Sequence, residues 1–149
     1  MRTIDWTEID FFDPEEFDDP EAPGSWIYMN PMTIHTLNDL RVRTGWKIVT
    51  HNRYGLRGCV CVRKAGHSAT SLHYAKNPAG CSAVDWHFVT DADPRAQALA
   101  VLQSGFTGIG CYYDWQWNSL SLPVGFHTDM RRRPQLWTRV DGRYVYLLK

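Results

Sequence analysis

The sequence lacks several features that would assign it to a simple class. It has no apolar run close to the ~18–20 residues that a membrane-spanning helix needs, so we expect no membrane span. Its first five residues lack the apolar centre of a secretory signal, and we therefore expect synthesis in a cytoplasm. There are no internal repeats and no sign of a second domain. A chain of 149 residues, 44% of them apolar, can bury a real core and predicts one domain over residues 1–149.

Net charge is also absent, because sixteen Lys and Arg balance sixteen Asp and Glu. The charges are unevenly distributed: residues 1–24 hold nine acids against Arg2, which leaves seven acids against fifteen bases in the remainder. The acidic N-terminal segment, residues 1–24, is typical of a solvated surface. The basic remainder would suit an anionic polymer, but no basic run is long enough to indicate nucleic acid. We expect a monomer that does not bind nucleic acid.

The four cysteines lack the spacing of a paired-knuckle metal site. Cys59 and Cys61 are two residues apart, but Cys81 and Cys111 form no second close pair. Half of a thiolate metal site is one interpretation of Cys59-Val60-Cys61. An even number of cysteines also allows disulfides, but without a secretory signal we expect reduced thiols.

Two short stretches place a histidine beside a carboxylate. Residues 83–89 and 124–130 both read as strands, and alternate residues of a strand share a face. Asp85 would then share a face with His87, and His127 with Asp129. Two histidines and one carboxylate are a common ligand set for catalytic zinc, which keeps a fourth position open for water.

We therefore predict that His73, Asp85 and His127 bind Zn2+, with His73 supplied by the long loop of residues 63–82. The alternative is that these histidines make ordinary hydrogen bonds at the rim of a core.

The remaining pattern predicts an α+β fold. Helices are expected over residues 30–45, capped by Asn30 and closed by Gly45, and over residues 93–105, with a short helical start at 13–17. The second helix would bury a stripe made of Ala96, Leu99, Ala100 and Leu102. Strands are expected at residues 46–50, 58–62 and 107–112, and a hairpin at 136–147 around Asp141-Gly142. We expect a small, mostly antiparallel sheet with two main helices on one side.

Three motifs in a fixed order resemble a known family. They are Ser71-x-His73 with Ala83-x-Asp85, then Gly108-Ile109-Gly110-Cys111-Tyr112, then Phe126-His127-Thr128-Asp129-Met130-Arg131 followed by Trp137. Together they resemble the zinc D-Ala-D-Ala carboxypeptidase-like peptidases, which share a fold with the hedgehog signalling domain. Within that group the similarity is to the branch found in phage lysins and bacterial cell-wall endopeptidases. It extends from about Phe12 to Trp137.

The upstream part of the chain follows the same family in outline. Residues 12–17 are similar to a Phe-Ser-x-x-Glu-Phe segment, and Leu40-Arg41 to the end of a family helix. The family strand that leads into Ile-Thr-Ser-Gly-Tyr-Arg corresponds to residues 48–53, which keep the arginine as Arg53.

The chain also departs from the family pattern around the first ligand. His73 lies twelve residues before Asp85, where the family has about seven, so an insertion at about residues 76–80 is implied. His67 is a competing first ligand, although it lacks the preceding serine. Cys81 stands where the family has a glycine, and Thr50-His51-Asn52 replaces Ser-Gly-Tyr.

The resemblance implies a zinc-dependent hydrolase of amide bonds in peptidoglycan stem peptides, of carboxypeptidase or endopeptidase type, and leaves both a phage and a host origin open. Such an enzyme would meet the cell wall after lysis or phage-mediated release. Arg53 would bind the substrate carboxylate through a two-pronged contact, the alternative being a surface salt bridge.

The general base of the family has no counterpart at the usual position in this chain. Relatives place a Glu or His two or three residues before the last ligand, where this chain has Val124 and Gly125. Asp129 is the first candidate because it shares a strand face with His127; its alternative role is to orient that histidine. His87 and Asp114 are weaker candidates. The missing local base leaves two other classes open: a zinc-binding module without catalysis, such as a phage tail component, and a structural protein without metal.

Overall fold

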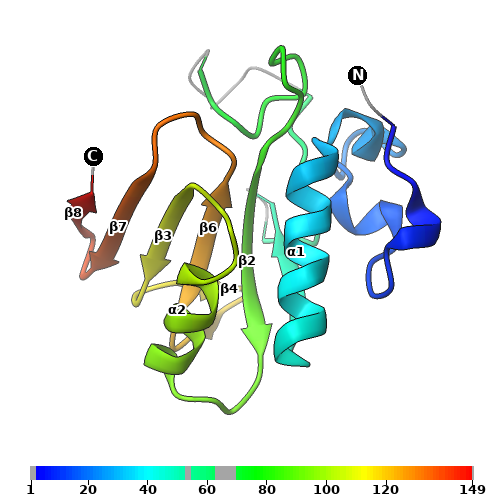
Figure 1. Cartoon of the computed structure of the whole chain (residues 1–149). Helices are drawn as coiled ribbons and strands as arrows, with labels where there is room; N and C mark the ends of the chain where they lie inside the picture. The colour runs from blue at the N-terminus through cyan, green and yellow to red at the C-terminus, as the bar shows by residue number, and fades with distance from the viewer. Residues whose placement is uncertain (1–2, 53–54, 63–69, 149) are drawn as a thin grey trace.

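The computed structural model describes residues 3–52, 55–62 and 70–148 of the chain. Its largest element is a six-stranded sheet in the spatial order β1-β2-β6-β3-β7-β8 (Figure 1). In that order the strands are β1 (Lys47–His51), β2 (Ala83–Val89), β6 (Gly125–Asp129), β3 (Gly108–Tyr112), β7 (Gln135–Val140) and β8 (Arg143–Leu148). Neighbouring strands run antiparallel except β3 and β7, which are parallel. A separate hairpin pairs β4 (Gln116–Trp117) with β5 (Leu120–Ser121).

Two α-helices, α1 (Pro31–Thr44) and α2 (Pro94–Leu102), lie over the same face of this sheet (Figure 1). Beside α1 the N-terminal segment forms three short 3-10 helices: η1 (Trp6–Glu8), η2 (Pro14–Phe17) and η3 (Ser25–Tyr28). The predicted α+β class, a small and mostly antiparallel sheet with two main helices, is therefore confirmed. Among the described residues no helix is both long and apolar enough to cross a membrane.

The boundaries of α1 follow from local signals. The Asn30 side chain accepts a hydrogen bond from the backbone N–H of Met32 at 2.9 Å, and Pro31 occupies the first helical position. Gly45 ends the helix in the left-handed region, with a φ of 68°. The predicted start and end of this helix are confirmed.

The sheet has one apolar and one polar face. Val84, Trp86 and Phe88 of β2 point into the core that α1 and α2 cover. The alternate residues of the same strand face the other way, and the register sets Asp85 between His51 of β1 and His127 of β6. The predicted alternation in β2 and β6 is thus confirmed, and it gathers polar side chains on the face away from the helices.

Two predicted elements differ in the structure. Residues 58–62 are buried but form no strand; they hydrogen bond to loops, with Val60 N donating to Phe17 O at 3.0 Å and Cys61 N to His73 O at 2.9 Å. The apolar residues of this segment correctly predicted its burial. They did not show that its backbone would hydrogen bond outside the sheet. This segment nevertheless matters to the site, because it holds the loop that carries His73.

The predicted buried stripe of α2 was also wrong. Leu99 is 56% exposed and Leu102 48% exposed, whereas Gln97 and Val101 are buried. The Gln97 amide is satisfied by donating to the carbonyl of Ala92 at 2.8 Å, which allows a polar residue on the packed face.

The hairpin of β7 and β8 matches the prediction closely. Asp141 and Gly142 have φ angles of 49° and 74°. Positive φ at both central residues is the requirement of a tight two-residue turn that matches the twist of the flanking strands.

Candidate metal centre

Three side chains from distant parts of the chain meet at one point on the polar face. His73 Nε2 lies 3.5 Å from Asp85 Oδ2 and 3.4 Å from His127 Nδ1, and His127 Nδ1 lies 2.7 Å from Asp85 Oδ1. A tetrahedral zinc with bonds of about 2.0–2.1 Å to nitrogen and oxygen separates its ligand atoms by about 3.3–3.4 Å. Two of the three separations already have that size, so the residues fit a zinc ion of this geometry.

The backbone explains why these side chains converge. Asp85 and His127 are directly paired residues of β2 and β6. His73 comes from a loop that two backbone hydrogen bonds hold in place. The N–H of Cys61 donates to the carbonyl of His73 at 2.9 Å, and the N–H of Ser82 donates to the carbonyl of Leu72 at 2.8 Å. The predicted ligand set is therefore brought together by one strand pair and one hydrogen-bonded loop.

Asp129 lies behind His127 rather than beside the open side of the site. Its Oδ2 accepts the Nε2–H of His127 at 3.0 Å, and the carboxylate is fully buried. Arg131 also holds it, with Nε donating to Oδ1 at 2.8 Å. A carboxylate in this position fixes which ring nitrogen faces a metal, so the geometry favours the orienting role over that of a general base.

Two glycines of β3 make room for this arrangement. A Cβ on Gly108 would lie 2.1 Å from Asp129 Oδ1, and a Cβ on Gly110 would lie 2.5 Å from the Trp137 indole. The Trp137 ring in turn packs on His127, with ring centroids 5.4 Å apart. The Gly108-Ile109-Gly110 motif thus serves packing around His127.

The charges of the three residues are strongly coupled. Burial alone would raise the pKa of Asp85, but His73 and His127 lower it to about 2. Burial opposes protonation of His127, yet Asp85 and Asp129 raise its pKa to about 9. The pKa of His73 is also raised, because Asp85 outweighs the effect of burial. Without a metal, a proton on His127 bridges to Asp85; a metal ion would take its place.

A second histidine pair lies next to Asp85. His51 Nε2 and His87 Nδ1 are 2.5 Å apart, and the His51 ring stacks on Trp117. Burial, followed by the nearby His87, lowers the pKa of His51 to about 3, and burial lowers that of His87 to about 4. The other ring nitrogen of His51, Nδ1, is buried and has no hydrogen-bond partner within the described parts of the chain. Both rings are therefore neutral at neutral pH.

A cavity of about 190 Å3 borders one histidine of each group, His73 and His51. Its wall includes His51, Cys59, His73, Asp85 and Trp115. Two of the three predicted zinc ligands therefore border a space that a small ligand or a water can enter. Sequence reasoning missed His51 at this wall; the one available signal was its place within the altered Thr50-His51-Asn52 segment.

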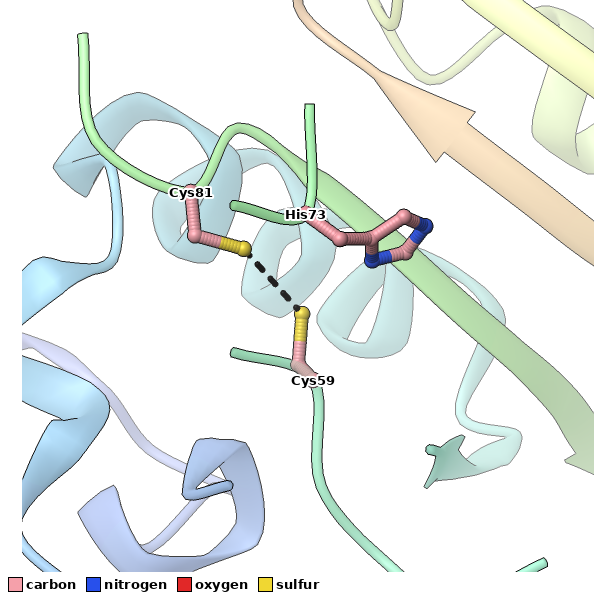
Figure 2. Close-up of side chains that lie close together, drawn as sticks. All are labelled: Cys59, His73 and Cys81. Carbon is pink, nitrogen blue, oxygen red and sulfur yellow. Dashed lines mark hydrogen bonds between the residues drawn. The ribbon is translucent and has the colours of Figure 1, made fainter. Parts of the chain in front are cut away.

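Two buried thiols form a further cluster on the other side of His73. The Sγ atoms of Cys59 and Cys81 are 3.7 Å apart (Figure 2). Both sulfurs also lie near the carbonyl oxygen of Ala83, at 2.8 Å from Cys59 and 3.4 Å from Cys81. The alternative interpretation of Cys59-Val60-Cys61 as half of a thiolate site differs from the structure, where the candidate metal group joins Cys59 with Cys81 and His73.

The remaining predicted residues have other positions. Arg53 and His67 lie outside the described residues. Asp114 accepts from Arg139 Nε at 2.8 Å and from Gly142 N at 2.6 Å, which ties it to the β7–β8 hairpin. Asp114 therefore stabilises the hairpin and is no longer a candidate for the general base.

Comparisons with known proteins add no relative: no family model, no curated protein and no solved structure matches this chain. The chain is a small α+β domain, and its described residues include two overlapping groups that could hold a metal ion: His73, Asp85 and His127, and Cys59, His73 and Cys81.

Proposed function

We propose that the protein is a zinc-dependent hydrolase that cleaves amide bonds in peptidoglycan stem peptides. The observation that carries the proposal is the convergence of His73, Asp85 and His127 within 4.8 Å, with His73 and Asp85 on the wall of a cavity. The substrate class comes from the ordered motifs that resemble cell-wall peptidases. The cleaved bond would be of carboxypeptidase or endopeptidase type.

The ligand set suits catalysis by its charge. Asp85 contributes one negative charge and the two imidazoles bind as neutral groups, so a divalent ion held here keeps a net positive charge. When bound, zinc lowers the pKa of a coordinated water and polarises a scissile carbonyl. The chain's own contribution is to fix three ligands and to hold the His127 ring through Asp129.

We assign the proton-accepting role to His51 rather than to Asp129. His51 is directly paired with Asp85 across β1 and β2 and borders the same cavity. If its Nε2–H donates to His87 Nδ1, its Nδ1 keeps a lone pair, and this nitrogen has no hydrogen-bond partner among the described residues. The lowered pKa keeps this lone pair unprotonated at neutral pH but makes it a weak base, and because Nδ1 is buried, the role requires water or substrate to reach it from the cavity.

Substrate recognition would depend on Arg53, by resemblance to the family residue that binds a substrate carboxylate. Trp115 borders the cavity and would contact an apolar part of the peptide.

A non-catalytic zinc-binding domain is the second candidate. The observation that favours it is the lack of an available acid at the described cavity wall besides Asp85. Asp19 also borders the cavity, but its two carboxylate oxygens accept the N–H groups of Glu21 and Val62 at 3.0 Å each. If neither His51 nor a residue outside the described ranges accepts a proton, the site holds zinc without turnover.

One experiment separates these classes. The purified protein is loaded with zinc, its metal content is measured, and it is incubated with purified peptidoglycan, whose released fragments are identified by mass. We expect about one zinc per chain and stem-peptide fragments that disappear with a chelator and in His127→Ala, whereas His35→Ala on α1 behaves like the parent. Full zinc content without released fragments would instead support the non-catalytic zinc-binding domain. Absence of bound zinc would indicate a structural protein without metal.

A further inference from the structure

The thiol cluster beside His73 has the donor set of a second metal site. Cys59 and Cys81 face each other although they are 22 residues apart in the chain, and both are buried. Figure 2 shows one ring nitrogen of His73 on the side of the two sulfurs, while the other points away from them. The nitrogen that faces Asp85 and His127 is Nε2, so the nitrogen on the thiol side is Nδ1.

The spacing of the donors agrees with metal coordination. Tetrahedral zinc with bonds of about 2.3 Å to sulfur separates two thiolates by about 3.8 Å. The observed separation of the two sulfurs is 3.7 Å. Without a metal, the two thiols donate to the Ala83 carbonyl oxygen, at 2.8 Å from Cys59 Sγ and 3.4 Å from Cys81 Sγ, so both sulfurs already point to one place.

Charge also favours an ion at this place. Two thiolates neutralise a divalent cation completely, and a neutral cluster tolerates burial far better than an isolated charge. Sulfur ligands prefer the softest ions, such as Cu+ and Cd2+, whereas the borderline ion Zn2+ also binds nitrogen and oxygen ligands. The His73–Asp85–His127 group, with one carboxylate and no sulfur, lacks this preference.

We propose that Cys59, Cys81 and His73 Nδ1 form a thiolate site for a soft d10 cation, and that this site competes with the His73–Asp85–His127 group for His73. A neutral imidazole has one nitrogen lone pair to give, because its other ring nitrogen carries the proton. His73 can therefore coordinate a metal through Nε2 together with Asp85 and His127, or through Nδ1 together with Cys59 and Cys81, but not both at once. One ion per chain follows, and a soft ion held by the thiols deprives the other group of a ligand.

Binding of a soft cation by Cys59 and Cys81 does not depend on hydrolysis. A protein that never cleaves peptidoglycan could still bind a soft cation through its thiols, and an active enzyme could lack the thiolate site. The two proposals therefore fail separately.

The test uses Cd2+ as the probe on the full chain under reducing, metal-free conditions. Bonds between Cd2+ and thiolates produce a charge-transfer absorption in the ultraviolet that nitrogen and oxygen ligands do not produce. We expect this absorption to saturate at one Cd2+ per chain in the parent. It should persist in His127→Ala, weaken in Cys59→Ser and in Cys81→Ser, and vanish in the double variant. Cys111→Ser is the matched control, because Cys111 is equally buried but lies in β3, opposite Phe126, and belongs to neither group that could hold a metal; it should leave the absorption unchanged.

A second measurement tests the competition. Zinc bound to the parent should be released as Cd2+ is added, whereas the Cys59→Ser/Cys81→Ser variant should retain its zinc at the same Cd2+ concentration. Circular dichroism of each variant verifies that it is folded. The proposal is overturned if the parent shows no thiolate absorption, if the absorption survives in the double variant, or if parent and double variant lose zinc equally.

Discussion

Asp129 accepts a hydrogen bond from Nε2 of His127 on the side of the imidazole ring away from Asp85. The contact is 3.0 Å long and the carboxylate that receives it is 0% exposed. Such a carboxylate fixes the ring and increases its basicity towards a metal on Nδ1. A group enclosed in this way has no path to a water on the cavity side.

The first prediction follows from that contact. Asp129→Asn should lower zinc affinity by roughly 10–100-fold, because the amide is neutral and orients His127 less strongly. Competition against a fluorescent chelator measures the change. Asp114→Asn, which alters the β7–β8 hairpin instead, should bind zinc like the parent. If Asp129→Asn keeps its zinc affinity and loses turnover by about 10²-fold, Asp129 is the general base after all.

The second prediction concerns the ligands themselves. His73→Ala, Asp85→Ala and His127→Ala should each reduce the zinc content well below that of the parent, measured by metal analysis after dialysis. His67→Ala should not, since His67 lacks the serine two residues before it that precedes His73. Loss of zinc in His67→Ala with retention in His73→Ala would move the first ligand and the position of the insertion.

The third prediction concerns pH. Asp85 and Asp129 raise the pKa of His127 to about 9, so at neutral pH zinc has to displace a proton from Nδ1. Zinc affinity should therefore increase as the pH rises towards about 9, and fall as the pH drops below it, rather than change near the unperturbed histidine value of 6.5 alone. Zinc titrations across this range measure the slope, and a constant affinity between these pH values would contradict it.

Local signals were sufficient for much of the fold. The Asn30 cap with Gly45, the Asp141-Gly142 turn and the alternation of β2 each depend on neighbours in sequence, and each was predicted correctly. The same alternation predicted the shared faces of Asp85 with His87 and of His127 with Asp129. Residues 58–62 were predicted wrongly, because an apolar run reports burial and not the partner of its hydrogen bonds.

The pairings between distant residues could not be predicted. His51 meets His87 through the register of β1 and β2, and a shift of one residue would have pointed His51 into the core. Cys59 and Cys81 lie 22 residues apart in the chain and come together only in the folded structure. Their spacing in the sequence does not predict this contact. The orienting role of Asp129 likewise required its burial and its contact with Arg131 to be known.

The fourth prediction concerns the His51–His87 pair and the stability of the metal-free protein. Both histidines are buried as neutral groups, with their pKa values lowered to about 3 and about 4 from 6.5. The stability that depends on their neutral state is fully present above pH 6.5 and is lost as the pH falls from there towards about 4, because the unfolded chain binds these protons first. Chemical unfolding with a chelator present, at several pH values, measures this loss.

A substitution isolates the contribution of one ring. His87→Gln cannot titrate but retains a polar partner for His51, so it should lose less stability than the parent between pH 6.5 and about 4. His35→Gln, on the half-buried side of α1, should follow the parent. Parallel losses in the parent and in His87→Gln would assign the acid sensitivity to other groups.

The last prediction concerns Arg53, which the resemblance makes the partner of a substrate carboxylate and which lies outside the described residues. A guanidinium presents a planar fork of donors that matches a carboxylate, and lysine does not reproduce it. Losing such a charge-assisted contact should cost about 2–4 kcal/mol of transition-state stabilisation. Arg53→Lys should therefore lower kcat/KM by tens-fold or more on peptidoglycan peptides, with zinc content unchanged. The loss should be smaller on a peptide whose carboxylate is amidated, because less of the contact exists there.

Arg57→Lys is the matched control, since Arg57 pairs with Glu16 at 3.1 Å. If Arg53→Lys equals the parent on both peptides while Arg57→Lys loses activity, Arg57 binds the substrate carboxylate instead.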